Sequence, residues 1–151
     1  MLDIVLVQPE IPQNTGNIGR TCVITGCRLH LVGPLGFSVS DTALKRAGLD
    51  YWPNLNVSIY SDWDEFWKQH QHRQVWCFTT KGARRHVDVP WPREAMMLFG
   101  RETAGLPPEI RALGENIRLP MGKCYRSYNL SNSVAVAIFE YLRQWDFPGL
   151  E

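Results

Sequence analysis

Residues Arg126 to Arg143 read R-S-Y-N-L-S-N-S-V-A-V-A-I-F-E-Y-L-R, and this stretch decides most of what the sequence predicts. It opens with small polar and amide side chains, and an apolar run of helical length follows. Ser131 and Asn132 are good helix N-caps, and the backbone N–H groups of a helix start can hold an anionic or polar ligand. The helix beyond is apolar on every side, so we expect burial on more than one face. Together these features predict a ligand site built against an interface.

The size and composition of the chain favour one globular domain over residues 1–151. The chain has 151 residues, of which 44% are hydrophobic and 21% charged, enough for a real core. No apolar run approaches the ~20 residues that span a bilayer. The opening M-L-D-I-V-L-V lacks a basic flank and a cleavage site, so it predicts a first strand and not a signal peptide. We expect a cytoplasmic protein with no membrane partner.

The cysteines and histidines do not have the spacing of a metal site. Cys22, Cys27, Cys77 and Cys124 form no C-x-x-C pair, and the histidines form no H-x-x-x-H. We therefore expect no metal, and buried thiols in a reducing compartment.

The net charge of +1 does not by itself indicate a nucleic-acid partner, but the kind of basic residue is informative. Twelve of the 16 basic residues are arginine, whose planar donor fork suits phosphate and base stacking. Lys81, Arg84 and Arg85 are expected together in one loop, and Lys45 with Arg46 in another. A solvated surface is the alternative interpretation of each group.

Strands and helices are expected to alternate along the chain. Short apolar runs predict strands at 2–7, 29–32, 57–60, 75–79, 96–99 and 117–119. Helices are expected from about Ile18 to a C-cap at Gly26, after Ser40-Asp41, over a segment with Trp63, Phe66 and Trp67, over 107–113 and over 132–145. A turn over 8–16 precedes the first helix, and Ser61 with Asp64 or Asp62 with Glu65 predicts a capping box.

This alternation predicts an α/β fold with a mostly parallel sheet flanked by helices. The nearly apolar runs 75–79 and 96–99 fit central strands covered on two faces. Ligands of such sheets bind beyond the carboxyl ends of the strands. Polar, glycine-rich segments follow the runs 2–7, 75–79, 96–99 and 117–119, so we expect the site at that edge.

The common phosphate, dinucleotide and nucleophile motifs are missing from the sequence. No P-loop lysine motif occurs, no G-x-G-x-x-G follows the first strand, and there is no G-x-S-x-G. Cys124 is a possible nucleophile, but no histidine lies near it in sequence. Backbone amides, glycines, small polar side chains, Glu102 and a few arginines remain. They suit a polar, nucleoside-like ligand that is oriented without metal or covalent catalysis.

Three ordered segments resemble a known family. N-T-G-N-I-G-R (14–20), F-G-R-E-T-A-G-L-P (99–107) and R-L-P-M followed by R-S-Y-N-L-S-N-S-V-A-V (118–136) are similar to the three motifs of the SPOUT RNA methyltransferases. The opening P-E-I-P-Q-N-T-G-N, with R-L-H-L and R-A-G-L-D-Y-W, resembles the small TrmL (YibK-like) subfamily in particular. The likeness runs from Met1 to about Gly149.

The resemblance implies a SPOUT fold with a deep C-terminal trefoil knot, an obligate homodimer, and S-adenosylmethionine as methyl donor, leaving S-adenosylhomocysteine. It implies methylation of the ribose 2′-hydroxyl at the wobble nucleotide, position 34, of tRNA, in leucine tRNAs where the substrate is known. The cofactor residues implied are Phe78, Thr79, Thr80, Gly100, Glu102, Gly105, Leu119, Met121, Ser127 and Asn132.

The resemblance also implies which residues act on the RNA. Arg20, Asn14, Ser127 and Asn129 match the positions assigned to catalysis, and Arg20 with Arg126 is expected to contact RNA. Arginine stays protonated near neutral pH, so we assign Arg20 positioning and electrostatics rather than proton transfer. The basic residues Lys81, Arg84 and Arg85 complete the expected RNA contacts.

Two other functions remain open, and the chain departs from the family in two places. It could methylate another RNA, such as ribosomal RNA, or it could be a non-catalytic RNA-binding module of the same fold. Relatives read G-P-E-T-R-G where this chain has G-R-E-T-A-G, which moves one positive charge to Arg101. The segment M-G-K-C-Y (121–125) also differs, which bears on how tRNA is recognised.

Overall fold

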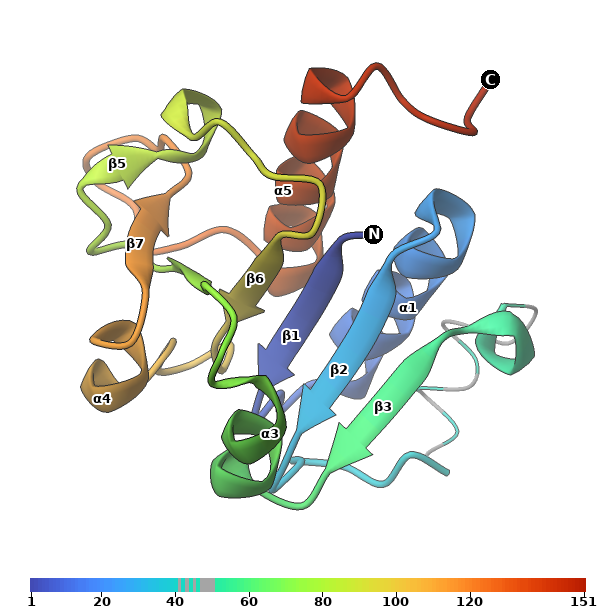
Figure 1. The fold of residues 1–151 in the computed structure, drawn as a ribbon. Helices are drawn as coiled ribbons and strands as arrows, with labels where there is room; N and C mark the ends of the chain where they lie inside the picture. The colour runs from blue at the N-terminus through green and yellow to red at the C-terminus, as the bar shows by residue number, and fades with distance from the viewer. Residues whose placement is uncertain (41, 43, 45, 47–50) are drawn as a thin grey trace.

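A seven-stranded parallel sheet carries helices on both faces (Figure 1). The computed structural model describes residues 1–40, 42, 44, 46 and 51–151, so most of the helix expected after Ser40-Asp41 lies outside the described residues. The sheet order is β3-β2-β1-β6-β4-β7-β5, and its strand pairs are parallel. The α/β class expected from the sequence is confirmed. The strands are β1 (Asp3–Val7), β2 (Arg28–Val32), β3 (Val57–Tyr60), β4 (Trp76–Phe78), β5 (Arg84–Arg85), β6 (Met96–Phe99) and β7 (Glu115–Arg118).

The helices divide between the two faces of the sheet. On one face α1 (Pro12–Thr25) and α5 (Leu130–Gln144) pack together over the sheet, and on the other lie α3 (Trp63–His70) and α4 (Pro108–Arg111). Two short 3-10 turns, Trp52–Asn54 and His86–Asp88, complete the described elements. Strands β4 and β6 each have neighbours on both sides and are fully buried, as expected for central strands.

The first helix begins earlier than predicted. The sequence predicts a turn over Gln8–Gly16, but α1 already starts at Pro12, so this prediction is wrong for most of the segment. Proline at the first helical position costs no hydrogen bond, because that N–H has no partner within the helix. Tertiary contacts, including hydrogen bonds from the Ile11 N–H and the Asn14 side chain to Glu102, then outweigh the low helix propensity of this turn. The expected C-cap is confirmed, since Gly26 has φ 71° and donates to the carbonyls of Cys22 and Val23.

The cap of α5 is Asn129, not Ser131 or Asn132. The Asn129 side chain accepts hydrogen bonds from the backbone N–H groups of both of those residues, which lie in the first turn. One face of α5 is buried, but Val136 and Phe139 on another face are 49% and 52% exposed. The burial of α5 on more than one face that the sequence predicts is therefore not seen within a single chain.

Strand β5 is absent from the sequence-based prediction. Arg84 and Arg85 were expected in a loop, but they pair with Ile117 and Arg118 as an edge strand. Two exposed charged residues give no hydrophobic alternation that could predict a strand. The Arg84 guanidinium instead bonds Glu115 at 2.8 Å, which supports the pairing of β5 with β7. The remaining element ends differ from expectation by a few residues, as is usual.

The cysteines follow the prediction at three of four positions. Cys22, Cys27 and Cys77 are buried, and burial raises the pKa of the Cys27 and Cys77 thiols to about 11. Cys124 is exposed in the loop after β7, so the expectation of a buried thiol is wrong there. In the described part of the chain, no group of three or more His, Cys, Asp or Glu could hold a metal ion. No helix described is long and apolar enough to cross a membrane.

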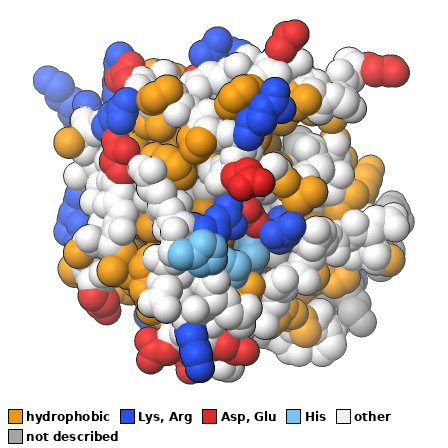
Figure 2. Space-filling model, viewed as in Figure 1, with side chains coloured by type: hydrophobic (Ala, Val, Ile, Leu, Met, Phe, Trp, Pro, Cys, Tyr) orange, Lys and Arg blue, Asp and Glu red, His pale blue; other side chains and the backbone are white. Residues whose placement is uncertain are grey.

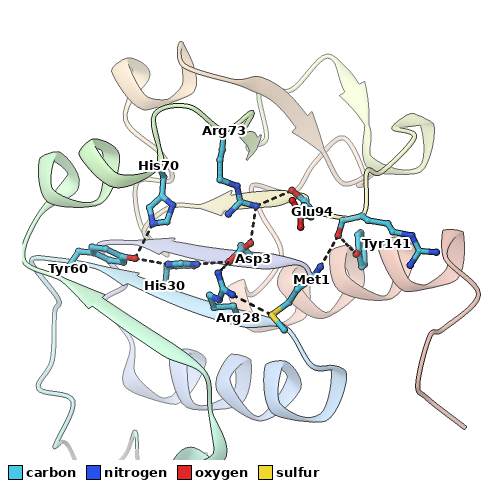
Figure 3. Close-up of polar contacts among 10 residues, drawn as sticks. Met1, Asp3, Arg28, His30, Tyr60, His70, Arg73, Glu94 and Tyr141 are labelled. Carbon is cyan, nitrogen blue, oxygen red and sulfur yellow. Dashed lines mark hydrogen bonds and ion pairs between the residues drawn. The ribbon is translucent and has the colours of Figure 1, made fainter.

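A buried polar cluster joins three neighbouring strands to α3 (Figure 3). Asp3 of β1 is 3% exposed and lies 2.8 Å from His30 Nε2 on β2. His30 Nδ1 lies 3.0 Å from the Tyr60 hydroxyl on β3, which lies 3.1 Å from His70 Nε2 on α3. Arg73 bonds the second Asp3 oxygen at 3.0 Å. Histidine, basic and acidic side chains accordingly gather near the middle of this face (Figure 2).

The neighbours of Asp3 keep its carboxylate ionised. Burial by itself would raise the pKa of Asp3, but the hydrogen bond with His30 and the charge of Arg73 outweigh it and hold the pKa below the usual 3.8. Because a carboxylate only accepts hydrogen bonds, His30 donates from Nε2. A lowered pKa means that ionised Asp3 stabilises the fold above its unfolded pKa. That stabilisation is lost as pH falls through the folded value.

We expect Asp3→Asn to lower the free energy of unfolding at pH 7 by about 3 kcal/mol, because it leaves buried partners without their counter-charge. The difference from wild type should begin to shrink below about pH 4, where Asp3 of the unfolded chain takes up a proton, and should shrink until the pH falls below the lower folded pKa. Urea denaturation at several pH values measures both effects. Asp64→Asn, at an exposed position on α3, is the matched control. A constant difference down to pH 2 would contradict this account.

Candidate functional site

A cavity of about 820 Å³ lies at the carboxyl ends of β1, β4, β6 and β7. It is lined by residues from the segments after each of these strands, so the expected site edge is confirmed. Expected cofactor, catalytic and RNA-contacting residues in its wall are Asn14, Phe78, Thr79, Thr80, Lys81, Gly100, Glu102, Gly105, Leu119, Met121, Arg126, Ser127 and Asn129.

Four expected site residues lie elsewhere. The described residues that line the cavity do not include Arg20, Arg84, Arg85 or Asn132. Arg20 is exposed on α1, and its guanidinium lies 4.8 Å from the Tyr51 ring centroid. Arg84 and Arg85 belong to β5 and pair with Glu115 and Asp88, at 2.8 and 2.7 Å. Their roles in catalysis and RNA contact stay predictions.

The loop after β6 folds back on itself at one wall of the cavity. Gly105 has φ +68°, which favours glycine, and its N–H donates to the Arg101 carbonyl at 2.9 Å. A Cβ atom on Gly100 would lie 2.1 Å from the carbonyl carbon of Gly105, so no side chain fits there. The two ends of this loop therefore pack backbone against backbone.

Glu102 binds the start of α1 across 92 residues of sequence. Its carboxylate accepts hydrogen bonds from the Glu10 N–H at 2.8 Å and the Ile11 N–H at 3.0 Å. Ile11 is the N-cap residue of α1 and has no polar side-chain atom of its own. A carboxylate at this position satisfies free N–H groups and complements the helix dipole. Glu102 thus caps the first helix from a distant loop.

The same two segments are tied a second time in the opposite direction. The Glu10 carboxylate accepts from the Thr103 N–H at 3.1 Å and from the Thr103 hydroxyl at 2.7 Å. These two hydrogen bonds hold the pKa of the Glu10 carboxyl below its usual value. The Arg101 guanidinium also bonds the Gln8 side-chain oxygen. The loop after β1 and the loop after β6 therefore form one interlocked wall.

A chain of amides extends this contact to α5. Asn14 donates to the Glu102 carboxylate at 3.4 Å, and Asn129 donates to the Asn14 side-chain oxygen at 3.1 Å. The Asn129 oxygen in turn caps α5. Each side-chain amide has both a donor and an acceptor, so orientation is passed from one residue to the next. The three sequence motifs meet in this relay.

The apolar part of the wall is aromatic. Phe78 and Phe99 stack with ring centroids 4.6 Å apart, and Leu119 and Leu106 also line the cavity. Hydroxyls of Thr79, Thr80 and Ser127 and loop backbone groups supply polar contacts in the same wall. A cavity of this size that is mostly apolar and has a few fixed polar groups is typical of small-molecule sites. It fits a nucleoside-bearing ligand.

Sequence reasoning missed part of the wall. Thr103, Tyr128 and Arg111 line the cavity, and Glu10 supports it, but none was expected there. Glu10 lies within the polar segment after the first strand, which was a usable signal. Its partner Thr103 is 93 residues away, and no local pattern indicates that pairing.

Known proteins resemble the whole chain. A model described as the SpoU rRNA methylase family matches residues 1–139. The tRNA (cytidine(34)-2′-O)-methyltransferase of Methylovorus glucosotrophus (strain SIP3-4) is 50% identical over 152 residues, covering 99% of each chain. A solved structure concerning 2-OH methylation of C/U34 on tRNA is 40% identical, with a TM-score of 0.93 over 97% of each chain.

A more distant structure shares the fold alone. The SpoU methyltransferase AviRb from Streptomyces viridochromogenes, in complex with the cofactor AdoMet, is 22% identical with a TM-score of 0.89. The match covers 97% of this chain and 58% of that one. The expected α/β architecture is confirmed by these likenesses, while threading of the C-terminal segment into a knot stays a prediction.

We expect Glu102→Gln to destabilise the protein by about 1–3 kcal/mol, because one carboxylate oxygen becomes an NH₂ group that faces backbone donors. Amide hydrogen exchange should accelerate most at Glu10 and Ile11, whose N–H groups lose their acceptor. Thermal unfolding and exchange followed by mass spectrometry measure these effects. Glu109→Gln, at an exposed acid in the same cavity wall, is the control. Equal exchange in the two variants would contradict the capping role.

Proposed function

Because the chain belongs to the SpoU rRNA methylase family, we propose that it transfers a methyl group from S-adenosylmethionine to the 2′-hydroxyl of nucleotide 34 of tRNA. The observation that carries this proposal is identity of 50% along its full length with a tRNA (cytidine(34)-2′-O)-methyltransferase. Leucine tRNAs are the first substrates to test, and action on tRNA implies the cytoplasm. The family resemblance noted from the three sequence motifs is confirmed.

The cavity fits the cofactor chemically. The stacked rings of Phe78 and Phe99 and the Leu119 side chain offer apolar surface to a purine. Loop backbone at Gly100 and Gly105 can bond its edge without interference from side chains. When bound, S-adenosylmethionine supplies the electrophilic methyl group. Every other task falls to residues of this chain.

The residues of this chain must orient the acceptor hydroxyl and supply charge for binding the RNA. Asn14 and Asn129, fixed by Glu102 at one end and the α5 cap at the other, can orient a ribose hydroxyl from the cavity wall. Ser127 and Arg126 line the same wall, where a hydroxyl and a guanidinium suit ribose and phosphate. Holding the acceptor in line lowers the barrier by several kcal/mol, at the scale of positioning effects in general.

We further propose that the active unit is a homodimer built on the exposed face of α5. Val136, Phe139 and Phe147 are 49%, 52% and 36% exposed, and the rings of Phe139 and Phe147 lie with their centroids 6.2 Å apart, so exposed apolar side chains adjoin at this end of α5. Arg20 lies on α1, which packs beside α5, and outside the cavity of its own chain. A second copy on this face offers a site for Arg20 to act. We therefore assign Arg20 to the partner's cavity.

We expect Arg20→Ala to keep its affinity for S-adenosylmethionine and to lower methyl transfer at least about a hundredfold, the scale of a lost electrostatic contact. Calorimetry measures cofactor binding, and transfer of labelled methyl groups to bulk tRNA measures activity. Lys68→Ala, at an exposed base on α3, is the control.

The wild-type protein decides between the broader alternatives in the same assays. Failure to bind cofactor would rule out the proposed function. Binding without transfer to any tRNA would favour a non-catalytic module, and transfer to ribosomal RNA alone would favour the other substrate. Loss of both binding and transfer in Arg20→Ala would make that arginine structural.

Mixing two inactive variants tests the assignment of Arg20 to the partner. Arg20→Ala and Asn129→Ser, unfolded together and refolded, should recover about one quarter of wild-type activity, because half of the dimers are mixed and each has one complete cavity. Serine keeps a cap on α5. Sedimentation confirms the dimers. Mixed dimers with no activity would place Arg20 in its own chain's reaction.

A further inference from the structure

The loop between β7 and α5 exposes an aromatic ring among positive charges. Tyr125 is 77% exposed, more than any other large hydrophobic side chain among the described residues. From Asn116 to Phe139 the chain carries Arg118, Lys123 and Arg126 and no acidic residue. A single exposed ring is common on protein surfaces, but a ring next to several basic side chains offers a surface that an unpaired base and its phosphates can contact.

The ring of Tyr125 is supported and not simply extended into solvent. A Cβ atom on Gly122 would lie 3.2 Å from Tyr125 Cδ2, so the ring packs against the Gly122 backbone. The Tyr125 N–H donates to the Gly122 carbonyl at 3.3 Å. The Tyr128 hydroxyl donates to the Pro120 carbonyl at 2.8 Å and ties the two ends of the loop together. Part of the ring is backed by protein, and most of it is open.

The same loop forms part of the cavity wall. Met121, Arg126, Ser127 and Tyr128 line the cavity, so Tyr125 lies on a loop at its rim. Basic side chains outnumber acidic ones in the wall, with Lys81, Arg101, Arg111 and Arg126 against Glu102 and Glu109. A polyanion approaching the cavity therefore meets positive charge and an open ring next to each other.

We propose that Tyr125 is a stacking platform for an unpaired base next to the methylated nucleotide, with Lys123 and Arg126 holding the flanking phosphates. This inference rests on the proposed function. A nucleotide that enters the cavity loses stacking on its neighbours, and an aromatic side chain restores it. Stacking needs only the face of a base, and the cations need only phosphate, so the loop recognises single-stranded RNA by its chemistry. Duplex RNA hides both base faces.

The first experiment measures binding of a 17-nucleotide anticodon stem-loop by fluorescence anisotropy at fixed salt. Tyr125→Ala should weaken binding about tenfold, the effect of one lost base stack, and Tyr125→Phe should stay within about twofold because the ring is kept. KM for tRNA should rise in Tyr125→Ala while kcat and cofactor affinity stay unchanged. Ile59→Ala, a truncation at a half-exposed position on β3, is the matched control.

Two further readouts separate stacking from general loop damage. With 2-aminopurine beside the target nucleotide, wild-type protein should quench its fluorescence and Tyr125→Ala should not. Lys123→Gln should reduce the slope of log affinity against log salt by about 0.7, the value for one phosphate contact on a single strand. An equal loss in both Tyr125 variants would mean that the hydroxyl, and not the ring, is used, and would overturn the proposal.

Other outcomes also decide the matter. Wild-type affinity in Tyr125→Ala would overturn the platform while leaving methyl transfer intact. A monomeric Tyr125→Ala protein would assign the ring to contact between copies and would equally overturn the proposal. Failure of the wild-type protein to bind S-adenosylmethionine or to methylate any tRNA would instead remove the proposed function itself. The two failures are therefore distinguishable.

Discussion

The hydrogen bonds of the Glu102 carboxylate are the contact on which the site depends. They connect the loop after β6 to the start of α1, and through Asn14 and Asn129 to the start of α5. Without this contact the loops after β1 and β6 would still be tied by Glu10 with Thr103 and by Arg101 with Gln8. Asn14 and Asn129, however, would lose the carboxylate that fixes one end of their amide chain. A carboxylate suits the task because its two oxygens accept several hydrogen bonds at once, with added strength from its charge.

A cavity wall must be rigid and must also present groups that contact a ligand, and different residues meet these two requirements here. Rigidity comes from reciprocal bonds behind the surface, such as Glu10 with Thr103, and from backbone packing at Gly100 that leaves no room for a side chain. The groups that face the cavity, which include amides, hydroxyls and aromatic rings, are available to contact a ligand. The opposite end of the sheet has its own polar cluster around Asp3. Apart from these two clusters, most of the buried side chains described are apolar.

Local patterns in the sequence predict the alternating elements, the parallel sheet and the edge where the cavity lies. They fail where long-range contacts decide the outcome. Local sequence predicts a turn at the start of α1 because Asn14 to Gly16 are poor helix formers, and the cap that compensates comes from Glu102. Arg84 and Arg85 carry no strand signal, since their pairing depends on β7. The family motifs named most of the cavity wall, but they could not place Arg20 outside it.

The hydrogen bond between Asn14 and Asn129 joins residues 115 positions apart in the sequence, and this separation matters while the chain is being synthesised. A chain emerging from the ribosome presents Asn14, in its first motif, 115 residues before Asn129, in its last. Until α5 has left the exit tunnel, the amide relay has no terminal member and one wall of the cavity is missing. Contacts this distant in sequence also slow folding, because the intervening chain must first be ordered. A chain that stops before α5 therefore lacks the part of the cavity wall that includes Asn129.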